Sequence, residues 1–362
     1  MKNIIIAAAI LGAFAANAQA QSNVTVYGIV DAGIVHESGG KAGNLTKVGS
    51  GIASASRFGF RGNEELGNGL SALFTIEGAV KVDTGVGGSG IFDRQSFVGL
   101  KSTTLGTVTL GRQYTPMYLA LSQVADPFAL GYSGSAKNLF ATVGNNTRIS
   151  NTVAYASPKV SGLSADLAYS AGEQAGSNVA GRQIGAVIAY SNGPLNVRLA
   201  RNSINSDITA SAATVAAPVR SVEIGRNTLF AANYDFVVAK AFFAFSDNKG
   251  LNSSVYPNAS AYSIAPVAAS TSNTTLLIGA TAPVGPAGTV MASYIRKNDK
   301  NSADNDANQF AIGYSYALSK RTNAYTSFAK IKNKKTASYT VGDNTDVGSG
   351  NKAFSVGVRH AF

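Results

Sequence analysis

The 362-residue sequence contains no cysteine. This absence excludes a disulfide framework, on which small exported domains depend but which a large β-structure does not need. Histidine is almost as scarce, with only His36 and His360. Neither has a serine or aspartate partner suited to a hydrolytic triad, and no set of histidines and cysteines could bind zinc. The sequence therefore predicts no metal site and no cofactor.

Charge and long apolar runs are also in short supply. Charged residues make up 14% of the chain, against about 25% in a typical soluble domain. After Ala20 no apolar stretch approaches the roughly 18 residues that mark a candidate transmembrane helix. Hydrophobic residues nevertheless make up 45% of the chain. They must therefore be distributed by alternation with small and polar residues.

The first twenty residues form a separate segment. Lys2 is a short basic start, residues 4–16 form an apolar run, and the sequence Ala-Gln-Ala at 18–20 resembles a cleavage site. This order predicts a secretory signal peptide over residues 1–20, and the alternative is a buried N-terminal helix. The mature chain, residues 21–362, would then be one exported domain, with a net charge one unit below the +11 of the whole sequence.

Alternation of apolar and small side chains runs along the mature chain. Its clearest case places five apolar residues on one face of a strand, with alanine, glycine and serine on the other. These are Phe310, Ile312, Tyr314, Tyr316 and Leu318. The chain also ends in such a pattern, because Phe354, Val356, Val358, His360 and Phe362 share one face.

Connections between the predicted strands alternate between tight and long. The tight ones carry the glycine, asparagine, serine and proline that short turns require. They lie at residues 65–69, 103–107, 157–162, 191–194, 282–288 and 319–322. The long ones, at 203–221, 249–273 and 333–350, are polar and show no steady period. Short turns at one end and long loops at the other are typical of an outer-membrane barrel.

About sixteen strand candidates have the length that a tilted strand needs to cross a bilayer. The sequence thus predicts an all-β fold, a 16-stranded antiparallel transmembrane β-barrel. Such a sheet must close, since an open edge would leave unpaired backbone groups in lipid. We expect the last strand, ending at Phe362, to pair with the first, residues 23–35. A secreted β-sandwich or β-helix is the alternative, although a β-helix needs a repeat of fixed period, which the sequence lacks.

Several segments resemble the trimeric general porins of Gram-negative bacteria, in the form found in β-proteobacteria and Neisseria. They are VTVYGIVDAGI (residues 24–34), SRFGFRGNEELGNGLSALFTIE (56–77), FDRQSFVGLKSTTLGTVTLGRQYTP (92–116), ALSKRTNAYTSF (317–328) and FSVGVRHAF (354–362). The resemblance implies a homotrimer of barrels in the outer membrane, each a water-filled pore narrowed by a third loop that folds inward. It also implies that the terminal aromatic, Phe362, is read by the assembly machinery.

Arginines are the candidate pore-lining residues. By strand parity Arg57 and Arg61 lie opposite the neighbouring phenylalanines, on the lumen face. Arg94 lies three positions before Phe97, which places it opposite that ring, and Arg148 has the parity of the inward positions of its strand. The family carries a row of basic residues along this wall, here called the basic ladder, at the positions matching Arg57 and Arg94. Arg148 matches the arginine that opens strand six in the family. The alternative for each is a solvated rim or a lipopolysaccharide contact, although arginine in a spanning segment usually lines water.

The opposite wall is predicted to be the third loop, Tyr114 to Thr147. Its charged residues are Asp126 and Lys137, and the family usually carries an acid near a Pro-Phe turn such as the one after Asp126. We expect Asp126 to face the arginines, unless it only caps a turn. Ala154 departs from the lysine or arginine that is common at its position in the family, so the ladder lacks one rung there.

The predicted function is an outer-membrane porin for passive diffusion of small hydrophilic solutes, with a preference for anions. A basic wall facing one acid leaves a positive potential, which concentrates anions in a narrow pore. A channel specific for a sugar, phosphate or organic acid is the alternative of the same fold, and an outer-membrane enzyme or an adhesin barrel is the alternative of another class. The basic residues are scattered over loops, which favours binding of lipopolysaccharide phosphates and outer-membrane lipid over nucleic acid.

Overall fold

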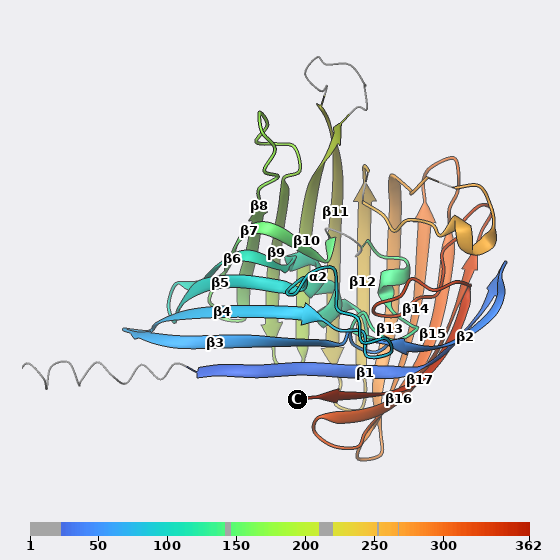
Figure 1. Ribbon diagram of the computed structural model, residues 1–362, viewed down its shortest axis with the longest axis horizontal. Helices are drawn as coiled ribbons and strands as arrows, with labels where there is room; N and C mark the ends of the chain where they lie inside the picture. The colour runs from blue at the N-terminus through green and yellow to red at the C-terminus, as the bar shows by residue number, and fades with distance from the viewer. Residues whose placement is uncertain (1–22, 142–145, 210–219, 252, 267) are drawn as a thin grey trace, which may run out of the picture.

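The computed structural model describes residues 23–141, 146–209, 220–251, 253–266 and 268–362 (Figure 1). The predicted signal peptide, residues 1–20, and the predicted start of the mature chain at Gln21 lie outside these residues. Across the described ranges, no helix has both the length and the apolar character needed to cross a membrane.

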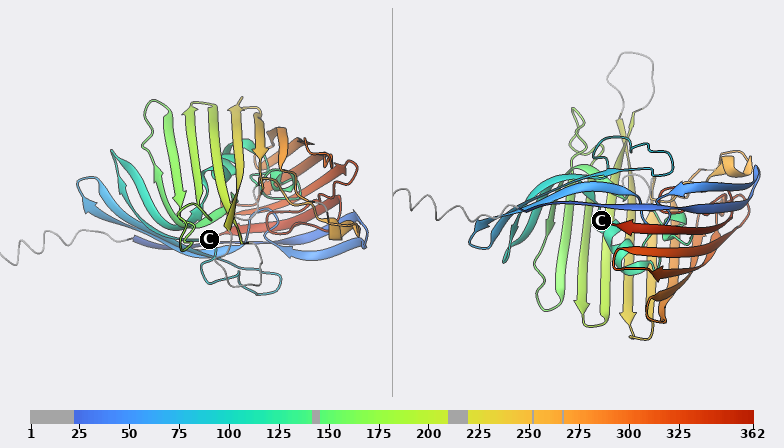
Figure 2. Two further views of the ribbon diagram at one scale, coloured as in Figure 1. Left: turned by 90° about the horizontal axis from the view of Figure 1, so that it is seen from above. Right: turned by 60° about the horizontal axis from the view of Figure 1, so that its bottom comes forward.

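A single sheet contains all the strands, and every neighbouring pair in it is antiparallel. Figure 2 shows the strands curving around a central space. The strands are β1 Asn23–Gly40, β2 Gly43–Ser50, β3 Arg57–Gly67, β4 Leu70–Ala79, β5 Gln95–Ser102, β6 Gly106–Tyr114, β7 Arg148–Ala156, β8 Leu163–Ser170, β9 Gln183–Asn192, β10 Leu195–Thr209, β11 Arg220–Asp235, β12 Lys240–Lys249, β13 Ser272–Val284, β14 Gly288–Asp299, β15 Ala307–Ala317, β16 Thr322–Asn333 and β17 Lys352–Ala361.

Two of these segments form one strand of the barrel. β2 and β3 both pair with β1 along the same edge, through Ala32↔Ser50 and Ile29↔Arg57. Residues 51–56 interrupt them and turn inward, which leaves Ile52 fully buried. Counted as one, β2 and β3 give the predicted barrel of sixteen strands.

The chain ends close the barrel as predicted. β17 pairs with β1 from Ile29↔Ala361 to Ser38↔Lys352. The last residue continues the ladder, because the backbone N–H groups of Gly28 and Phe362 each donate to the other residue's carbonyl at 3.1 Å. A Cβ on Gly28 would lie 2.3 Å from Cζ of Phe362, so only glycine leaves room for the ring at this position. Closure removes the sheet edge that lipid could not hydrogen-bond.

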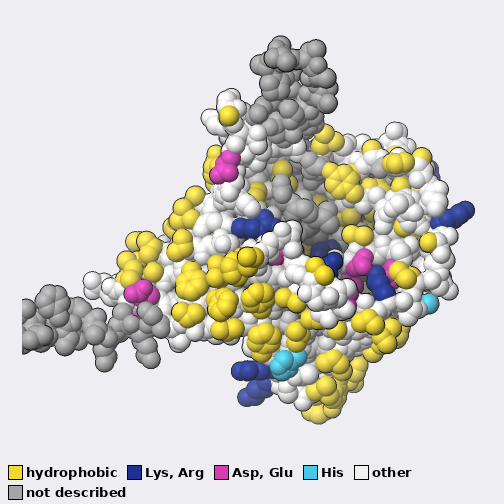
Figure 3. All heavy atoms as spheres, in the orientation of Figure 1, with side chains coloured by type: hydrophobic (Ala, Val, Ile, Leu, Met, Phe, Trp, Pro, Cys, Tyr) yellow, Lys and Arg dark blue, Asp and Glu magenta, His cyan; other side chains and the backbone are white. Residues whose placement is uncertain are grey.

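The two faces of the wall differ as the alternation predicts. Phe354, Val356 and Val358 are about half exposed on the outside, at 47%, 45% and 50%, whereas Ser355 between them is fully buried. Hydrophobic side chains cover the outer face of the strands nearest the viewer in Figure 3. The outer surface is therefore suited to lipid and the inner surface to water and to packed loops.

All six predicted tight turns join neighbouring strands at one end of the barrel, and the long connections lie at the other. One prediction needs correction. The long connection expected at residues 203–221 is in part strand, because β10 and β11 stay paired as far as Thr209↔Arg220. Cross-strand hydrogen bonds extend this hairpin despite its polar composition.

Loop 3 (residues 115–147) is the third connection at the end of the barrel opposite the tight turns. It folds into the barrel, as the resemblance implies (Figure 1). Thr115 caps the short helix α2, Pro116–Ala120, by accepting a hydrogen bond from the backbone of Tyr118, and Pro116 occupies its first turn. Helical turns η1, Leu121–Ala125, and η2, Ala136–Asn138, follow within the loop, and η4, Ala259–Tyr262, lies in a later one.

Loop 3 packs against the inner wall and forms much of the buried apolar core with it. Small wall residues make this possible. A Cβ on Gly279 would lie 2.8 Å from the Pro127 ring, and one on Gly313 would lie 2.9 Å from the Phe128 ring. Loop 3 therefore covers the wall on one side and leaves the strands that carry the arginines facing the lumen.

Candidate functional site

Three arginines from different parts of the barrel wall come together on one side of the lumen. Arg57 opens β3, Arg94 lies just before β5, and Arg148 opens β7. Tyr114, the last residue of β6, joins two of them, because its hydroxyl accepts hydrogen bonds from Arg94 Nη2 at 2.6 Å and Arg148 Nη2 at 3.0 Å. The convergence that the resemblance implies is thus present in the structure.

Glu77 on β4 binds the other side of this cluster. Its Oε1 atom accepts from Arg94 Nε at 2.7 Å, Oε2 lies 3.9 Å from Arg57 Nε, and Oε2 also accepts from the Tyr27 hydroxyl at 3.0 Å. Glu77 is buried. One carboxylate against three guanidinium groups leaves two positive charges in the cluster. We name these four residues, Arg57, Glu77, Arg94 and Arg148, the arginine cluster.

Sequence reasoning missed Glu77, although a signal for it was present. The tight turn at residues 65–69 sets the hairpin register, in which Gly59 lies opposite Glu77. Because Gly59 has the inward parity of Arg57, Glu77 must face inward as well.

Aromatic stacking links the arginine cluster to loop 3. The ring of Tyr118 in α2 is parallel to that of Tyr114, with centroids 4.9 Å apart and planes 5° apart. The guanidinium carbon of Arg148 lies 4.6 Å from the centre of the Tyr114 ring, within the range of a cation–π contact. The start of loop 3 is therefore held against the basic wall.

The parity argument for Arg94 rested on a wrong premise, although Arg94 does join the cluster. Phe97 lies in an inward row with Thr75 and Arg61, while its neighbour Val98 is 57% exposed on the outside. Arg94 precedes β5, so the alternation of that strand does not determine the direction of its side chain.

Arg61 faces the lumen but lies outside the cluster. It pairs with Thr75 on β4, two inward rows from Arg57 toward the turn end of the barrel. Its guanidinium carbon is 5.2 Å from the centre of the Tyr27 ring.

The structure does not place Asp126 opposite the arginines. The carboxylate is buried inside loop 3, where it accepts backbone N–H groups of Phe128, Leu130 and Ala136 at 2.9–3.0 Å. Burial raises the pKa of this carboxyl to about 6. The turn-capping role, which the sequence left as the alternative, is the one observed, because three loop donors need an acceptor once the loop is buried.

Replacing Asp126 with alanine should therefore loosen loop 3 and leave the charge of the pore wall unchanged. Each buried N–H left without a partner costs about 1–3 kcal/mol. We expect a lower thermal stability and a noisier open-channel current, with the reversal potential in a salt gradient unchanged. A large shift of reversal potential without loss of stability would contradict this role.

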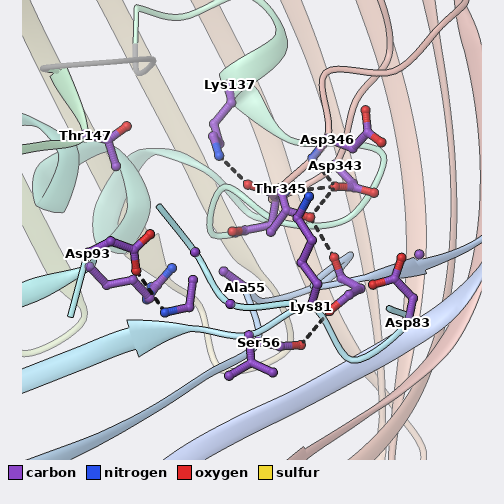
Figure 4. A pocket seen from close by; sticks show the side chains of 18 of the residues that line it. Ala55, Ser56, Lys81, Asp83, Asp93, Lys137, Thr147, Asp343, Thr345 and Asp346 are labelled. Atoms are coloured by element: carbon purple, nitrogen blue, oxygen red, sulfur yellow. Dashed lines mark hydrogen bonds between the residues drawn. The ribbon is translucent and has the colours of Figure 1, made fainter. Parts of the chain in front are cut away.

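A hollow of about 490 Å³ opens beside the arginine cluster (Figure 4). Arg94, Arg148 and Tyr118 line one part of it, and Lys137 of loop 3 and Asp343 of loop 8 (residues 334–351) line another. Figure 4 shows Lys137 and Asp343 extending from the loops into this space. The wall facing the arginines is thus mixed in charge.

Asp343 was not foreseen as lining the pore, and Lys137 was noted only as a charged residue of the loop predicted to form the opposite wall. Burial lowers the pKa of the Lys137 ammonium to about 8 and raises that of the Asp343 carboxyl to about 7. Lys137 Nζ donates to the carbonyl of Asn344 at 2.5 Å. Loop 8 reaches this position through contacts with residues far away in the sequence. The alternation of apolar and polar residues along a strand gives no information about such contacts.

Loop 8 is also tied to the first hairpin. Lys47 Nζ lies 2.6 Å from Glu37 Oε1 and 2.7 Å from Asp346 Oδ2. The Thr345 hydroxyl donates to the carbonyl of Ser50 at 2.6 Å. Lys47 is thus shared by two carboxylates, and these contacts hold loop 8 against the first hairpin beside the lumen.

The remaining sequence candidates have simple environments. Ala154 faces the lumen, in a row between Thr109 and Ala168. His36 and His360 each share a hydrogen bond with a threonine hydroxyl, of Thr46 and Thr322. In the described part of the chain, no group of three or more potential metal-ligating side chains is assembled.

The chain matches the Gram-negative porin family over residues 7–336. It is 32% identical over 378 aligned residues to outer membrane porin protein 32 of Delftia acidovorans and 31% identical over 405 to an outer membrane porin protein of Bordetella pertussis, with all of both chains covered in each case. Among solved structures it resembles an anion-selective porin from Comamonas acidovorans, with a TM-score of 0.74, 30% identity and coverage of 94% of this chain and 100% of that chain.

Proposed function

Since this chain belongs to the Gram-negative porin family and forms an outer-membrane channel rather than an enzyme, we propose that its pore prefers small anions to cations. The arginine cluster carries this proposal, because its three guanidinium groups are opposed by one carboxylate. A net positive wall in a narrow, low-dielectric passage raises the local concentration of anions. The similarity to an anion-selective porin supports the same preference.

The reversal potential of single channels in a potassium chloride gradient tests the proposal. A sign that indicates chloride over potassium is expected. The preference should weaken at high salt, because the Debye length falls from about 10 Å at 0.1 M to about 3 Å at 1 M. A potassium preference of the unmodified channel would overturn the proposal.

Porins of this family are typically trimeric, and we propose a homotrimer for this chain. We also propose that Phe362 serves in assembly as well as in closure, and that the excess of basic residues on the exposed loops binds lipopolysaccharide phosphates.

Replacing Ala154 with lysine should strengthen the anion preference modestly. The position faces the lumen between two small neighbours, Thr109 and Ala168, so a long side chain can extend into water. The expected change of the chloride to potassium permeability ratio is less than about fivefold, because a solvated charge at about 4 Å contributes only about 1 kcal/mol. Ala154→Gln is the matched control for side-chain size. Equal effects of lysine and glutamine would show that size, not charge, acts there.

The anion preference should also fall as pH rises through about 8. Burial lowers the pKa of Lys137 to about 8, so the ammonium is charged below that pH and neutral above it. Asp343, with its pKa raised to about 7, loses its proton in an adjoining range and acts in the same direction. In Lys137→Gln the preference should be weaker at neutral pH and the step near pH 8 absent, whereas Asp343→Asn should keep that step. The reversal potential should be measured about one pH unit below pH 8 and about one pH unit above it. Equal values at the two pH values would contradict this role of Lys137.

A further inference from the structure

A second hollow, of about 380 Å³, lies at the turn end of the barrel on the other side of loop 3 from the arginine cluster. Phe128, Ala129 and Tyr132 of loop 3 form part of its lining, and the turn between β15 and β16 forms another part. None of its described lining residues also lines the hollow beside the arginine cluster. In outer-membrane barrels the short turns face the periplasm, so this hollow lies at the periplasmic mouth of the pore.

Among the residues that the structure describes, three cations and no carboxylate line this hollow: Lys320 and Arg321 in the turn and Arg359 on β17. The acid in register with Arg359 is Asp31 on β1. It is fully buried, and its carboxylate accepts from the Tyr325 hydroxyl and the Ser54 backbone N–H, both at 2.6 Å. Asp31 offsets part of the charge of Arg359 but presents no oxygen to the hollow, and Lys320 and Arg321 add two further positive charges.

Hydrogen bonds position these cations. Arg359 Nε donates to the Ser54 hydroxyl at 3.1 Å, and its Nη1 lies 3.5 Å from the Asn323 side-chain oxygen. The Ser319 hydroxyl accepts the backbone N–H groups of Arg321 at 3.2 Å and Thr322 at 3.0 Å. This capping fixes the turn and keeps the bases of the Lys320 and Arg321 side chains at the rim.

We propose that this hollow is a binding site for a small polyvalent oxyanion, such as inorganic phosphate, at the periplasmic mouth. The proposal rests on the anion preference proposed above and extends it to a second, separate place on the ion path. Solvent screens a single exposed ion pair, but an anion with two charges engages two cations at once. Its several oxygens also match the guanidinium donors of Arg359 and the serine, threonine and asparagine side chains of the lining.

A site at this position would act after the constriction. Conduction requires binding that is favourable enough for entry yet weak and divided among sites so that the ion can leave. The arginine cluster alone would hold a divalent anion in the narrowest part. A second group of cations nearer the exit lowers the free-energy cost for the anion of leaving the arginine cluster. The same group slows passage of the anion at the mouth.

Block of the chloride current by inorganic phosphate tests the proposal. Phosphate is added to each side of an oriented single channel in turn, and the concentration for half block is measured. With phosphate on the periplasmic side, the double variant Lys320→Gln, Arg321→Gln should weaken the block by at least about fivefold. Both residues are in an exposed turn, so the barrel should assemble normally, and Arg359→Lys should weaken the block without removing the charge beside Asp31.

The matched control is Lys159→Gln, which removes a cation from the turn between β7 and β8, outside this hollow. It should leave the half-blocking concentration unchanged. An unchanged block in the double variant, or an equal loss in the control, would overturn the site.

The reversal potential of the same channels separates this proposal from the general one. Loss of block in the double variant with a chloride preference that persists supports both. A potassium preference of the unmodified channel would overturn the proposed anion selectivity. The dependence of the phosphate block on the side of addition would still show whether the site at the mouth binds phosphate.

Discussion

Replacing Arg94 with serine is expected to move the reversal potential toward potassium more than any other single change in the pore wall. Arg94 joins both halves of the arginine cluster, since it binds Glu77 through Nε and Tyr114 through Nη2. Its loss reduces the net charge of the cluster from two positive charges to one and leaves the buried carboxylate with Arg57 at 3.9 Å. Even in water, a unit charge at about 4 Å is worth about 1 kcal/mol, which is about a fivefold change in relative anion permeability.

Two further variants test the sign and the place of this effect. Glu77→Gln should raise the chloride preference, because it removes the acid that binds Arg94 and lies beside Arg57. Arg61→Ser is the matched control, since Arg61 faces the same lumen but lies outside the cluster. A reversal potential that Arg94→Ser leaves unchanged, or that Arg61→Ser shifts by the same amount, would show that the cluster does not set selectivity.

Deletion of Phe362 should reduce the yield of assembled protein several-fold. The deletion removes the final pair of backbone hydrogen bonds to Gly28 and the ring that covers it. Unpaired backbone groups at a seam in lipid are costly, at several kcal/mol for each group. The measurement is the fraction of membrane-inserted protein that migrates as a folded oligomer in unheated gels and as a monomer after boiling.

Phe362→Tyr serves as the control for this deletion. It keeps the backbone pairing and an aromatic ring over Gly28, so assembly should be close to normal. Phe362→Ala keeps the backbone and removes only the ring, which separates the two contributions. Normal oligomer yield from the deletion would count against both the closing role and the assembly role of the terminal residue.

Local rules of the sequence predict the wall of this barrel well. The alternation from Phe354 to Phe362 assigns both faces of the last strand, because side chains in a strand point to opposite sides whatever the rest of the fold does. Strand parity likewise places Arg57 in the lumen, and hairpin register could have placed Glu77. It does not account for Arg148, because a bulge in β7 shifts the register between Thr152 and Ile149.

The opposite side of the pore could not be derived in this way. Loop 3 has no period to read, so a lone acid in it could equally face the lumen or bind its own backbone, and Asp126 does the latter. Lys137 and Asp343 line the same hollow only because two loops distant in sequence dock against each other. Composition reports that such loops are polar, whereas their paths depend on tertiary contacts.

The inward break between β2 and β3 has a consequence for the order of folding. The carbonyl of Ile52 accepts the backbone N–H groups of both Tyr132 in loop 3 and Asn344 in loop 8, at 2.7 and 3.3 Å. Early, middle and late parts of the chain thus meet at one atom, whereas each strand hairpin joins residues close in sequence. Contacts of such wide sequence separation form slowly. We therefore expect the hairpins to form first. The docking of loops 3 and 8 on Ile52 and the pairing of β17 with β1 should follow, because each of these joins distant parts of the chain.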